Sequence, residues 1–228
     1  MNSKMGILER GTSYDSVLEA LRAAIIAGEF QSGSQLKQSV IAEKLGVSQG
    51  PVREALGRLT VEGLVETIPF RGMFVRKLAK CDVEEIYQVR MALEVLAFRL
   101  AFNTLREPKN IQMLEKLLVV TVEAAKTPDY EAAVAADLNF HRYLVELSDN
   151  TRLLKIWDSL LAQARFILSK LYALNEGANI MNLALNHEKL LISINEGDLN
   201  ESIRMIEEHL EFARISLLDN WEEVVRES

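Results

Sequence analysis

The sequence has little of what a secreted or membrane protein needs. Its single cysteine, Cys81, cannot form an intrachain disulfide, and no stretch approaches eighteen uninterrupted apolar residues. The first ten residues also lack the apolar run of an export signal. We therefore expect a protein of the reducing cytoplasm that does not enter a membrane.

Low-complexity and strongly biased segments are also missing. Hydrophobic residues make up 49% and charged residues 26% of the 228 positions, which excludes collagen-like and wholly disordered chains. A chain of this length can hold two domains, each with its own core.

Charge and glycine are distributed unevenly along the chain. The whole chain carries −7, but residues 1–80 carry +3 and residues 81–228 carry −10. Nine of the eleven glycines lie before residue 73, as expected when short elements with tight turns give way to long helices. This pattern indicates a small, modestly basic binding module followed by an acidic body.

Apolar residues at helical spacing predict three helices in the first part, at about 14–27, 39–45 and 51–62. Gly46 can end the second helix at a positive φ, and either Ser48 or Gly50 can cap the third, with Pro51 in its first turn. Residues 64–68 and 73–77 alternate as two strands around a turn at 69–72, which predicts a hairpin. A helix-turn-helix followed by a hairpin is a winged helix.

Beyond residue 82 the pattern is helical throughout. Turn and cap residues divide it into six segments, at about 83–105, 108–126, 129–148, 151–174, 178–196 and 199–222. The sequence therefore predicts a mainly α protein in which a winged helix-turn-helix precedes an all-α antiparallel bundle. We expect an arm at 1–12, a DNA-binding domain at 13–77, a linker at 78–82, a metal-binding, effector-binding and dimerisation domain at 83–222, and a tail at 223–228.

The run LKQSVIAEKLGVSQGPVREALGRL at 36–59, with EGLV at 62–65 and RG at 71–72, resembles the GntR family of bacterial transcription regulators. The resemblance implies that residues 51–56 begin the recognition helix and that Gly72 occupies the tip of the wing. The residues we expect to contact DNA are Ser39, Ser48, Gln49, Arg53, Arg58, Arg71 and Gly72.

Arginine suits these positions for physical reasons. Arg53 lies near the helix N-terminus, where its guanidinium can bind a guanine edge through two hydrogen bonds, and Arg58 can reach phosphates. Gly72 lets the wing backbone approach the minor groove. The alternative is that Arg53 and Arg58 form surface ion pairs with Glu54 and Glu62.

Two residues depart from the usual GntR pattern. Gln49 follows the turn serine where the family commonly has Arg, and Gln38 stands where it commonly has Glu. Because Gln reads adenine through two hydrogen bonds where Arg would read guanine, the operator is expected to differ from the family's TGT…ACA type of site.

The chain's three histidines, His141, His187 and His209, each fall on the expected inward stripe of a different helix, His209 with Met205 and Phe212. Asp137 precedes His141 by one turn, so a carboxylate and an imidazole share a helix face and the set can converge on one metal. The alternative is three hydrogen-bonded core histidines.

These positions resemble the FCD effector domain of the FadR-like branch of the GntR family, in its six-helix VanR-type version. The resemblance implies that Asp137, His141, His187 and His209 hold a divalent metal, with zinc the first choice and nickel, iron or manganese also suitable.

Two inward arginines are candidates for binding an effector. Arg90 precedes Glu94 by one turn, so it is expected either to pair with Glu94 or to bind the carboxylate of a small organic acid. Arg165 is a second candidate with a more structural character. We treat the large aromatic residues as core, namely Phe98, Phe140, Trp157, Phe166 and Phe212.

Together these features predict a ligand-responsive transcription regulator and not an enzyme. It is expected to bind a pseudo-palindromic operator as a homodimer, because one module of charge +3 neutralises few phosphates. Two alternatives stay open: a DNA-binding regulator whose bundle only dimerises, and a metal-dependent enzyme, for which the sequence offers no convincing general base.

Overall fold

The computed structural model describes residues 14–127, 129–174, 178–219 and 221. The expected arm at 1–12 and tail at 223–228 lie outside the described residues. The chain divides into two compact units between Leu78 and Ala79. The predicted fold class is confirmed, with a winged helix in the first unit and a helical bundle in the second.

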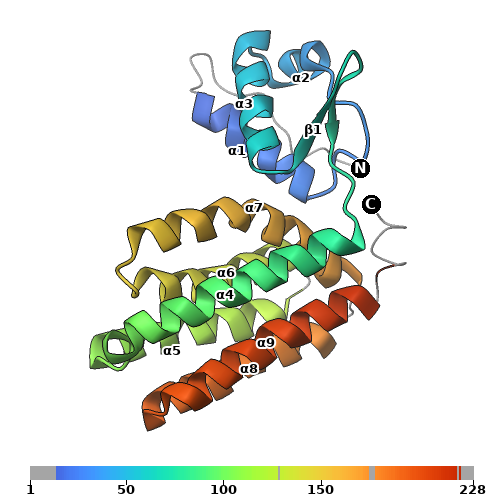
Figure 1. Cartoon of the computed structure of the whole chain (residues 1–228). Helices are drawn as coiled ribbons and strands as arrows, with labels where there is room; N and C mark the ends of the chain where they lie inside the picture. The colour runs from blue at the N-terminus through green and yellow to red at the C-terminus, as the bar shows by residue number, and fades with distance from the viewer. Residues whose placement is uncertain (1–13, 128, 175–177, 220, 222–228) are drawn as a thin grey trace. The chain divides into compact units, whose positions relative to one another are not determined.

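From residue 14 onward, the first unit is built from three helices and a hairpin (Figure 1): α1 (Tyr14–Ile26), α2 (Gln38–Leu45), α3 (Gln49–Val61), β1 (Val65–Ile68) and β2 (Gly72–Val75). α1 and α2 pack against α3. The inward face of α3 is fully buried, through Val52, Ala55, Leu56 and Leu59. The two strands pair antiparallel from Val65↔Val75 to Ile68↔Gly72.

The turn between α2 and α3 forms as predicted at Gly46 but is capped differently. Gly46 has φ 71° and ends α2, and its N–H bonds back to the carbonyls of the last helical turn. Ser48 is the residue before α3, yet its side chain makes no capping hydrogen bond. One reason is that Pro51, three residues on, has no N–H to donate.

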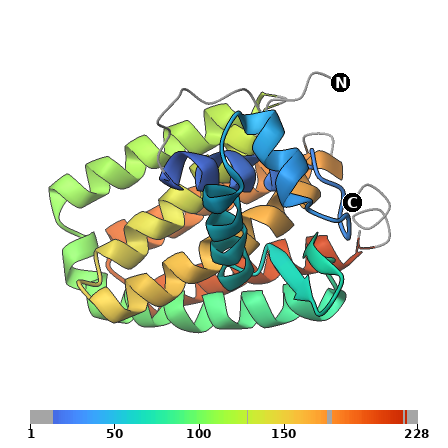
Figure 2. The ribbon, with the colours of Figure 1, turned by 90° about the horizontal axis from the view of Figure 1, so that it is seen from above.

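The second unit contains six helices in the described residues: α4 (Lys80–Leu105), α5 (Pro108–Ala125), α6 (Tyr130–Glu146), α7 (Thr151–Leu174), α8 (Ala178–Glu196) and α9 (Leu199–Asp219). They run roughly alongside one another in both views (Figure 1 and Figure 2). α4 packs on α9, α6 and α7, while α5 packs on α6 and α8. The six predicted segments agree with these helices to within a few residues.

Polar residues at the helix starts fix the boundaries. The carboxylate of Asp129 accepts the N–H of Ala132 at 3.0 Å, and that of Asp198 accepts the N–H of Glu201 at 3.0 Å. Asp82 does the same for the N–H of Ala79 at 2.7 Å. Because of this contact α4 begins at Lys80, inside the segment predicted as a linker.

α9 differs in detail from its predicted inward face. His209 is buried, but Met205 and Phe212 are only half-buried. The prediction that Phe212 is a core residue was therefore wrong. The buried stripe instead runs through Ile206, Leu210 and Ala213. Helical periodicity allowed either choice, and packing against α4 and α8 decided it. Within the described part of the chain, no helix is long and apolar enough to cross a membrane.

The backbone at Gly46 and Gly57 generates a matched pair of stability predictions. Gly46→Ala places a Cβ at φ 71° and should lower the free energy of unfolding by about 1–2 kcal/mol. Gly57→Ala in the middle of α3 meets no atom within 4 Å and should raise it by about 0.5–1 kcal/mol. Urea unfolding of both variants measures this, and equal signs would contradict the turn geometry.

Candidate functional site

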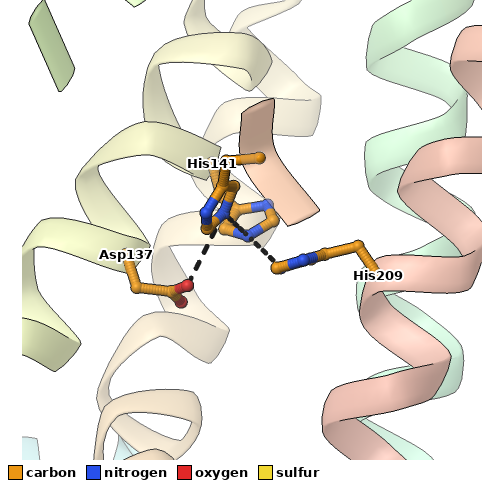
Figure 3. Close-up of side chains that lie close together, drawn as sticks. Asp137, His141 and His209 are labelled. Atoms are coloured by element: carbon orange, nitrogen blue, oxygen red, sulfur yellow. Dashed lines mark hydrogen bonds and ion pairs between the residues drawn. The ribbon is translucent and has the colours of Figure 1, made fainter. Parts of the chain in front are cut away.

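Four buried side chains from three helices meet inside the second unit. α6 supplies Asp137 and His141 from successive turns, α8 supplies His187, and α9 supplies His209. All four are at least 97% buried, and one ligand atom of each lies within 4.8 Å of the others. Asp137 and His141 point across the interior toward His209 (Figure 3).

The distances between these atoms suit a bound cation. Nε2 of His141 lies 3.1 Å from Nε2 of His209 and 3.1 Å from Nε2 of His187, and Nε2 of His187 lies 3.6 Å from the Asp137 carboxylate. Metal–nitrogen bonds of about 2.0–2.1 Å would separate neighbouring ligand nitrogens by about 3.0–3.3 Å. The donor set, three imidazoles and a carboxylate, therefore fits a divalent transition metal.

Glu94 on α4 fixes the orientation of His141. Its carboxylate accepts the Nδ1 proton of His141 at 2.7 Å, which leaves Nε2 as the ring nitrogen that faces the cluster. The same carboxylate accepts bonds from Arg90 Nε at 3.0 Å and Trp157 Nε1 at 3.1 Å. Burial opposes ionisation, but His141, Arg90 and these bonds hold the pKa of Glu94 far below its usual value.

Sequence reasoning missed two of these roles. Trp157 is buried as predicted, but its indole N–H also supports the carboxylate that holds His141. Glu94 was expected only as a partner of Arg90. The i,i+4 spacing signalled that pair, whereas contacts to residues 47 and 63 positions away leave no local pattern.

The other two histidines are held neutral. Burial, followed by the nearby histidine charges, lowers the pKa of His187 and His209 well below the usual value. Their Nδ1 atoms have no hydrogen-bond partner of ordinary geometry, although the backbone of Ala184 partly offsets the shift at His187. Burial also raises the pKa of Asp137, against the effect of His141 and Arg90. Neutral imidazoles are the form that a metal binds.

These observations weigh against three core histidines satisfied by hydrogen bonds. The Nε2 atom of His141 lies 3.1 Å from that of each other histidine, and Nε2 of His187 lies 3.6 Å from the Asp137 carboxylate, so the ring nitrogens crowd around one point. A cation at their centre would satisfy all three lone pairs and the Asp137 carboxylate.

Arg90 forms the expected ion pair with Glu94, and one of its nitrogens stays without a hydrogen-bond partner among the described residues. Its Nε pairs with Glu94, and its guanidinium lies 5.3 Å from the centre of the Tyr87 ring. Nη2 of Arg90 is buried without a hydrogen-bond partner. The hydroxyl of Tyr87, which sequence reasoning also missed, is likewise buried and lacks a bond of ordinary geometry. The Arg90 guanidinium also acts on this hydroxyl, and its effect opposes the rise in the pKa of Tyr87 that burial causes.

Arg165 is not brought into this cluster. Its Nη2 donates to Glu131 at 3.0 Å, and both side chains are about a third exposed. Nε of Arg165 is buried and has no hydrogen-bond partner among the described residues. The ion pair with Glu131 is consistent with the structural character expected for Arg165, and a role in effector binding stays a prediction.

The first unit presents all seven expected DNA contacts on its surface. Ser39 lies in the first turn of α2, Ser48 and Gln49 lie at the start of α3, and Arg71 and Gly72 lie on the hairpin. Each of the seven is exposed. The winged helix therefore offers these groups to a partner.

The two arginines of α3 differ in their environment. Arg53 is exposed and makes no ion pair or hydrogen bond within the described residues. Arg58 Nε donates to Glu62 at 3.2 Å, and Glu62 also accepts two bonds from Arg22, at 2.9 and 2.8 Å. The expected surface pair forms at Arg58 but not at Arg53.

A basic winged helix joined to a helical domain with a buried three-histidine cluster defines a class of bacterial transcription regulators. Residues 13–75 match the model of the bacterial regulatory proteins of the gntR family, and residues 85–212 match that of the FCD domain. The chain belongs to the GntR family and carries an FCD domain. It is a DNA-binding transcription regulator and not an enzyme, as predicted.

Relatives agree with this assignment over most of their length. The chain is 31% identical to a probable D-xylose utilization operon transcriptional repressor of Paenarthrobacter nicotinovorans, over 84% of this chain and 82% of the relative. It is 27% identical to the gluconate operon transcriptional repressor of Bacillus subtilis, over 94% and 88%. The solved structure of Escherichia coli McbR/YncC shares the fold, with a TM-score of 0.78, 24% identity and coverage of 92% and 99%.

The depressed histidine pKa values generate a pH prediction for the metal-free protein. His187 and His209 bind protons in the unfolded state below about pH 6.5 but resist protonation when folded. The free energy of unfolding should therefore fall as pH falls from 7 to 5, by at most about 2.7 kcal/mol per unit for two protons. Urea unfolding in chelator measures this slope.

A single substitution isolates the histidine contribution. The slope of His209→Gln should be smaller by up to about 1.4 kcal/mol per pH unit, because one proton no longer distinguishes the folded and unfolded states. Asp137, whose pKa is raised, acts in the opposite direction in both proteins. An identical slope in the two proteins would contradict burial of a neutral His209.

Proposed function

We propose that the chain acts as a homodimer, binds a pseudo-palindromic operator through its winged helices, and responds to a small organic acid held beside a divalent metal in the FCD domain. The observation that carries the proposal is the buried cluster of Asp137, His141, His187 and His209 next to the unpaired Nη2 of Arg90.

Zinc is our first choice for the metal, with nickel, iron and manganese also compatible with three imidazoles and a carboxylate. When bound, the metal supplies a buried positive charge that attracts an anion. The chain supplies the rest: Glu94 holds His141 in one tautomer, and the buried Asp137 carboxylate balances part of the cation's charge.

A carboxylate is the effector chemistry that best satisfies the remaining groups. Arg90 offers a buried Nη2 donor that is already fixed by its bond to Glu94, and Tyr87 offers a buried hydroxyl. The gluconate operon repressor among the relatives has a hydroxylated carboxylate in its name. We therefore favour a small acid that carries at least one hydroxyl group.

The DNA-binding role is assigned by position within the first unit. The start of α3 is proposed to enter the major groove, where Arg53 reads guanine and Gln49 reads adenine. Arg58 and Arg71 are proposed to contact phosphates, as are Ser39 and Ser48. With Gln38, Gln49 makes the half-site differ from that of relatives with Arg and Glu at these positions.

Dimerisation supplies the two modules that a palindromic site requires. Val89, Leu96 and Leu100 lie on one side of α4 and are 43%, 44% and 51% exposed. Such an apolar stripe is suited to burial against a second copy of the chain. An effector that binds one relative arrangement of the two copies more tightly than another would then alter DNA binding.

A regulator with a dimerising but non-sensing bundle is the second candidate. It predicts that small acids leave operator affinity unchanged. The unpaired Nη2 of Arg90 and hydroxyl of Tyr87 favour sensing, because buried donors without partners are costly unless a ligand uses them.

Native mass spectrometry of the purified protein with metal analysis tests the whole proposal, since one spectrum reports the number of chains, the metal and any retained acid. A metal-free monomer would refute it.

Arg53→Ala should abolish operator preference while leaving the fold intact. The substitution removes a base-edge contact worth about 1–3 kcal/mol from each half-site, and the Arg53 side chain has no partner to lose among the described residues. Fluorescence anisotropy with specific and random duplexes measures the change. Arg152→Ala, which removes an exposed arginine of the bundle, is the control. Undiminished preference in Arg53→Ala would show that α3 does not read bases.

His187→Ala should remove both the metal and the acid response but spare DNA binding by the separate first unit.

Glu94→Gln should have a graded effect, because it keeps an acceptor near His141 but loses the charge, and metal affinity should fall about 10- to 100-fold. Competition with a chromophoric chelator measures affinity, and elemental analysis measures content.

The exposed Glu123→Gln on α5 is the control for Glu94→Gln.

Chelation with verified metal removal should lower the melting temperature of the wild-type protein, since the proposed metal would join three helices. Full metal content in His187→Ala would instead establish core histidines without a metal.

A further inference from the structure

The hairpin of the winged helix ends in an exposed aromatic side chain, Phe70. The ring is fully exposed at 109% relative accessibility, the highest value among the large apolar residues of the described chain. No described residue covers it. An isolated, fully exposed phenylalanine adds nothing to the stability of the folded unit.

The backbone at this position also disfavours phenylalanine. Pro69 and Phe70 are the central residues of a turn closed by a hydrogen bond from Arg71 N–H to the carbonyl of Ile68, at 3.0 Å. Phe70 has φ 63°, which with proline before it defines a type II turn. Glycine or asparagine is the usual residue there, and a bulky side chain at positive φ is strained. Neither packing nor turn geometry explains the ring.

The rest of the hairpin holds this tip rigidly. Gln35 pairs with Phe74 through the backbone, and its side-chain amide donates to the carbonyl of Arg71 at 2.7 Å. The guanidinium of Arg71 lies over the Phe74 ring, 5.5 Å from its centre. Because the turn backbone is already held by these bonds, little backbone freedom would be lost when the tip binds a partner.

The surroundings of the tip favour DNA over an apolar partner. Arg71 supplies an adjacent positive charge, and Gly72 has no side chain to keep the backbone away from a phosphate-lined groove. Proteins that enter the minor groove often combine a basic residue with an apolar side chain that wedges between base pairs.

We propose that Phe70 is a wedge that enters the minor groove and partly unstacks one base step in each half-site. This inference rests on the proposed placement of the wing against DNA, but it adds a contact that depends on base stacking and not on charge. It makes Phe70 a specificity-determining residue, because pyrimidine–purine steps unstack most easily.

The test uses the full-length protein and duplexes selected by the wild-type protein from a random library. Phe70→Asn removes the ring and suits the positive φ, whereas Phe70→Trp keeps a wedge. Val119→Ala, which truncates an exposed apolar residue of α5, is the control. Binding is measured at several salt concentrations, and 2-aminopurine is placed at successive positions across the half-site to report unstacking.

Phe70→Asn should bind the selected duplex about 10-fold more weakly or worse, with an unchanged dependence on salt, while its melting temperature is equal to or above that of the wild type. Arg71→Ala should instead reduce the salt dependence. The wild type and Phe70→Trp should both raise 2-aminopurine fluorescence at one step, and Phe70→Asn should not.

Unchanged affinity of Phe70→Asn, or a loss of affinity without any step-specific fluorescence change in the wild type, would overturn the wedge. Failure of the wild-type protein to select any duplex would refute the DNA-binding role itself and is thereby distinguished from failure of this inference. Reduced dimer formation by Phe70→Asn, with DNA contacts unchanged, would assign the ring to a protein interface and also overturn the wedge.

Discussion

The carboxylate of Glu94 organises the interior of the second unit. It is 1% exposed and accepts hydrogen bonds from His141, Arg90 and Trp157, which lie on three different helices. A buried carboxylate is stable only when such partners compensate the loss of water. Because the three donors must converge on it, Glu94 fixes the orientation of the His141 ring, while Nη2 of Arg90 has no hydrogen-bond partner among the described residues. The geometry of the Asp–His cluster and of the proposed effector site therefore depends on this one group.

The two units of the regulator differ in net charge and in where they place their charged groups. The first unit is basic and keeps its polar groups on the surface, where they can exchange water for phosphates and base edges. The second unit is acidic and places its important charges inside, where low dielectric strengthens their interactions. A ligand bound within such a buried network would act on it strongly, whereas the exposed polar side chains of the first unit are free to adapt to a partner. The family relationship is thus supported by two physically different kinds of site.

Most of the fold could be predicted because its signals are local. Helical spacing and turn residues predicted the helices, and the structure shows that Asp129, Asn150 and Asp198 cap the starts of three of them. The three histidines and Asp137 were recognisable because each lay on an apolar helix face. The predicted start of α4 was a few residues too late because the Asp82 cap was not recognised. The predicted inward face of α9 was also wrong, since it included the half-buried Met205 and Phe212. Helical periodicity limits the buried side of a helix to a range of directions around its axis, and packing against neighbouring helices decides which residues within that range are buried.

The sequence by itself determined the family, the division into two units, and the four side chains of the buried Asp–His cluster, because these follow from motifs and spacings of a few residues. Tertiary structure decided which groups meet across the fold: Glu94 with His141 and Trp157, and Arg165 with Glu131 instead of the cluster. It also showed that Phe70 stands uncovered on a strained turn. These facts depend on the relative rotation and contact of elements far apart in the chain, which helical periodicity does not encode.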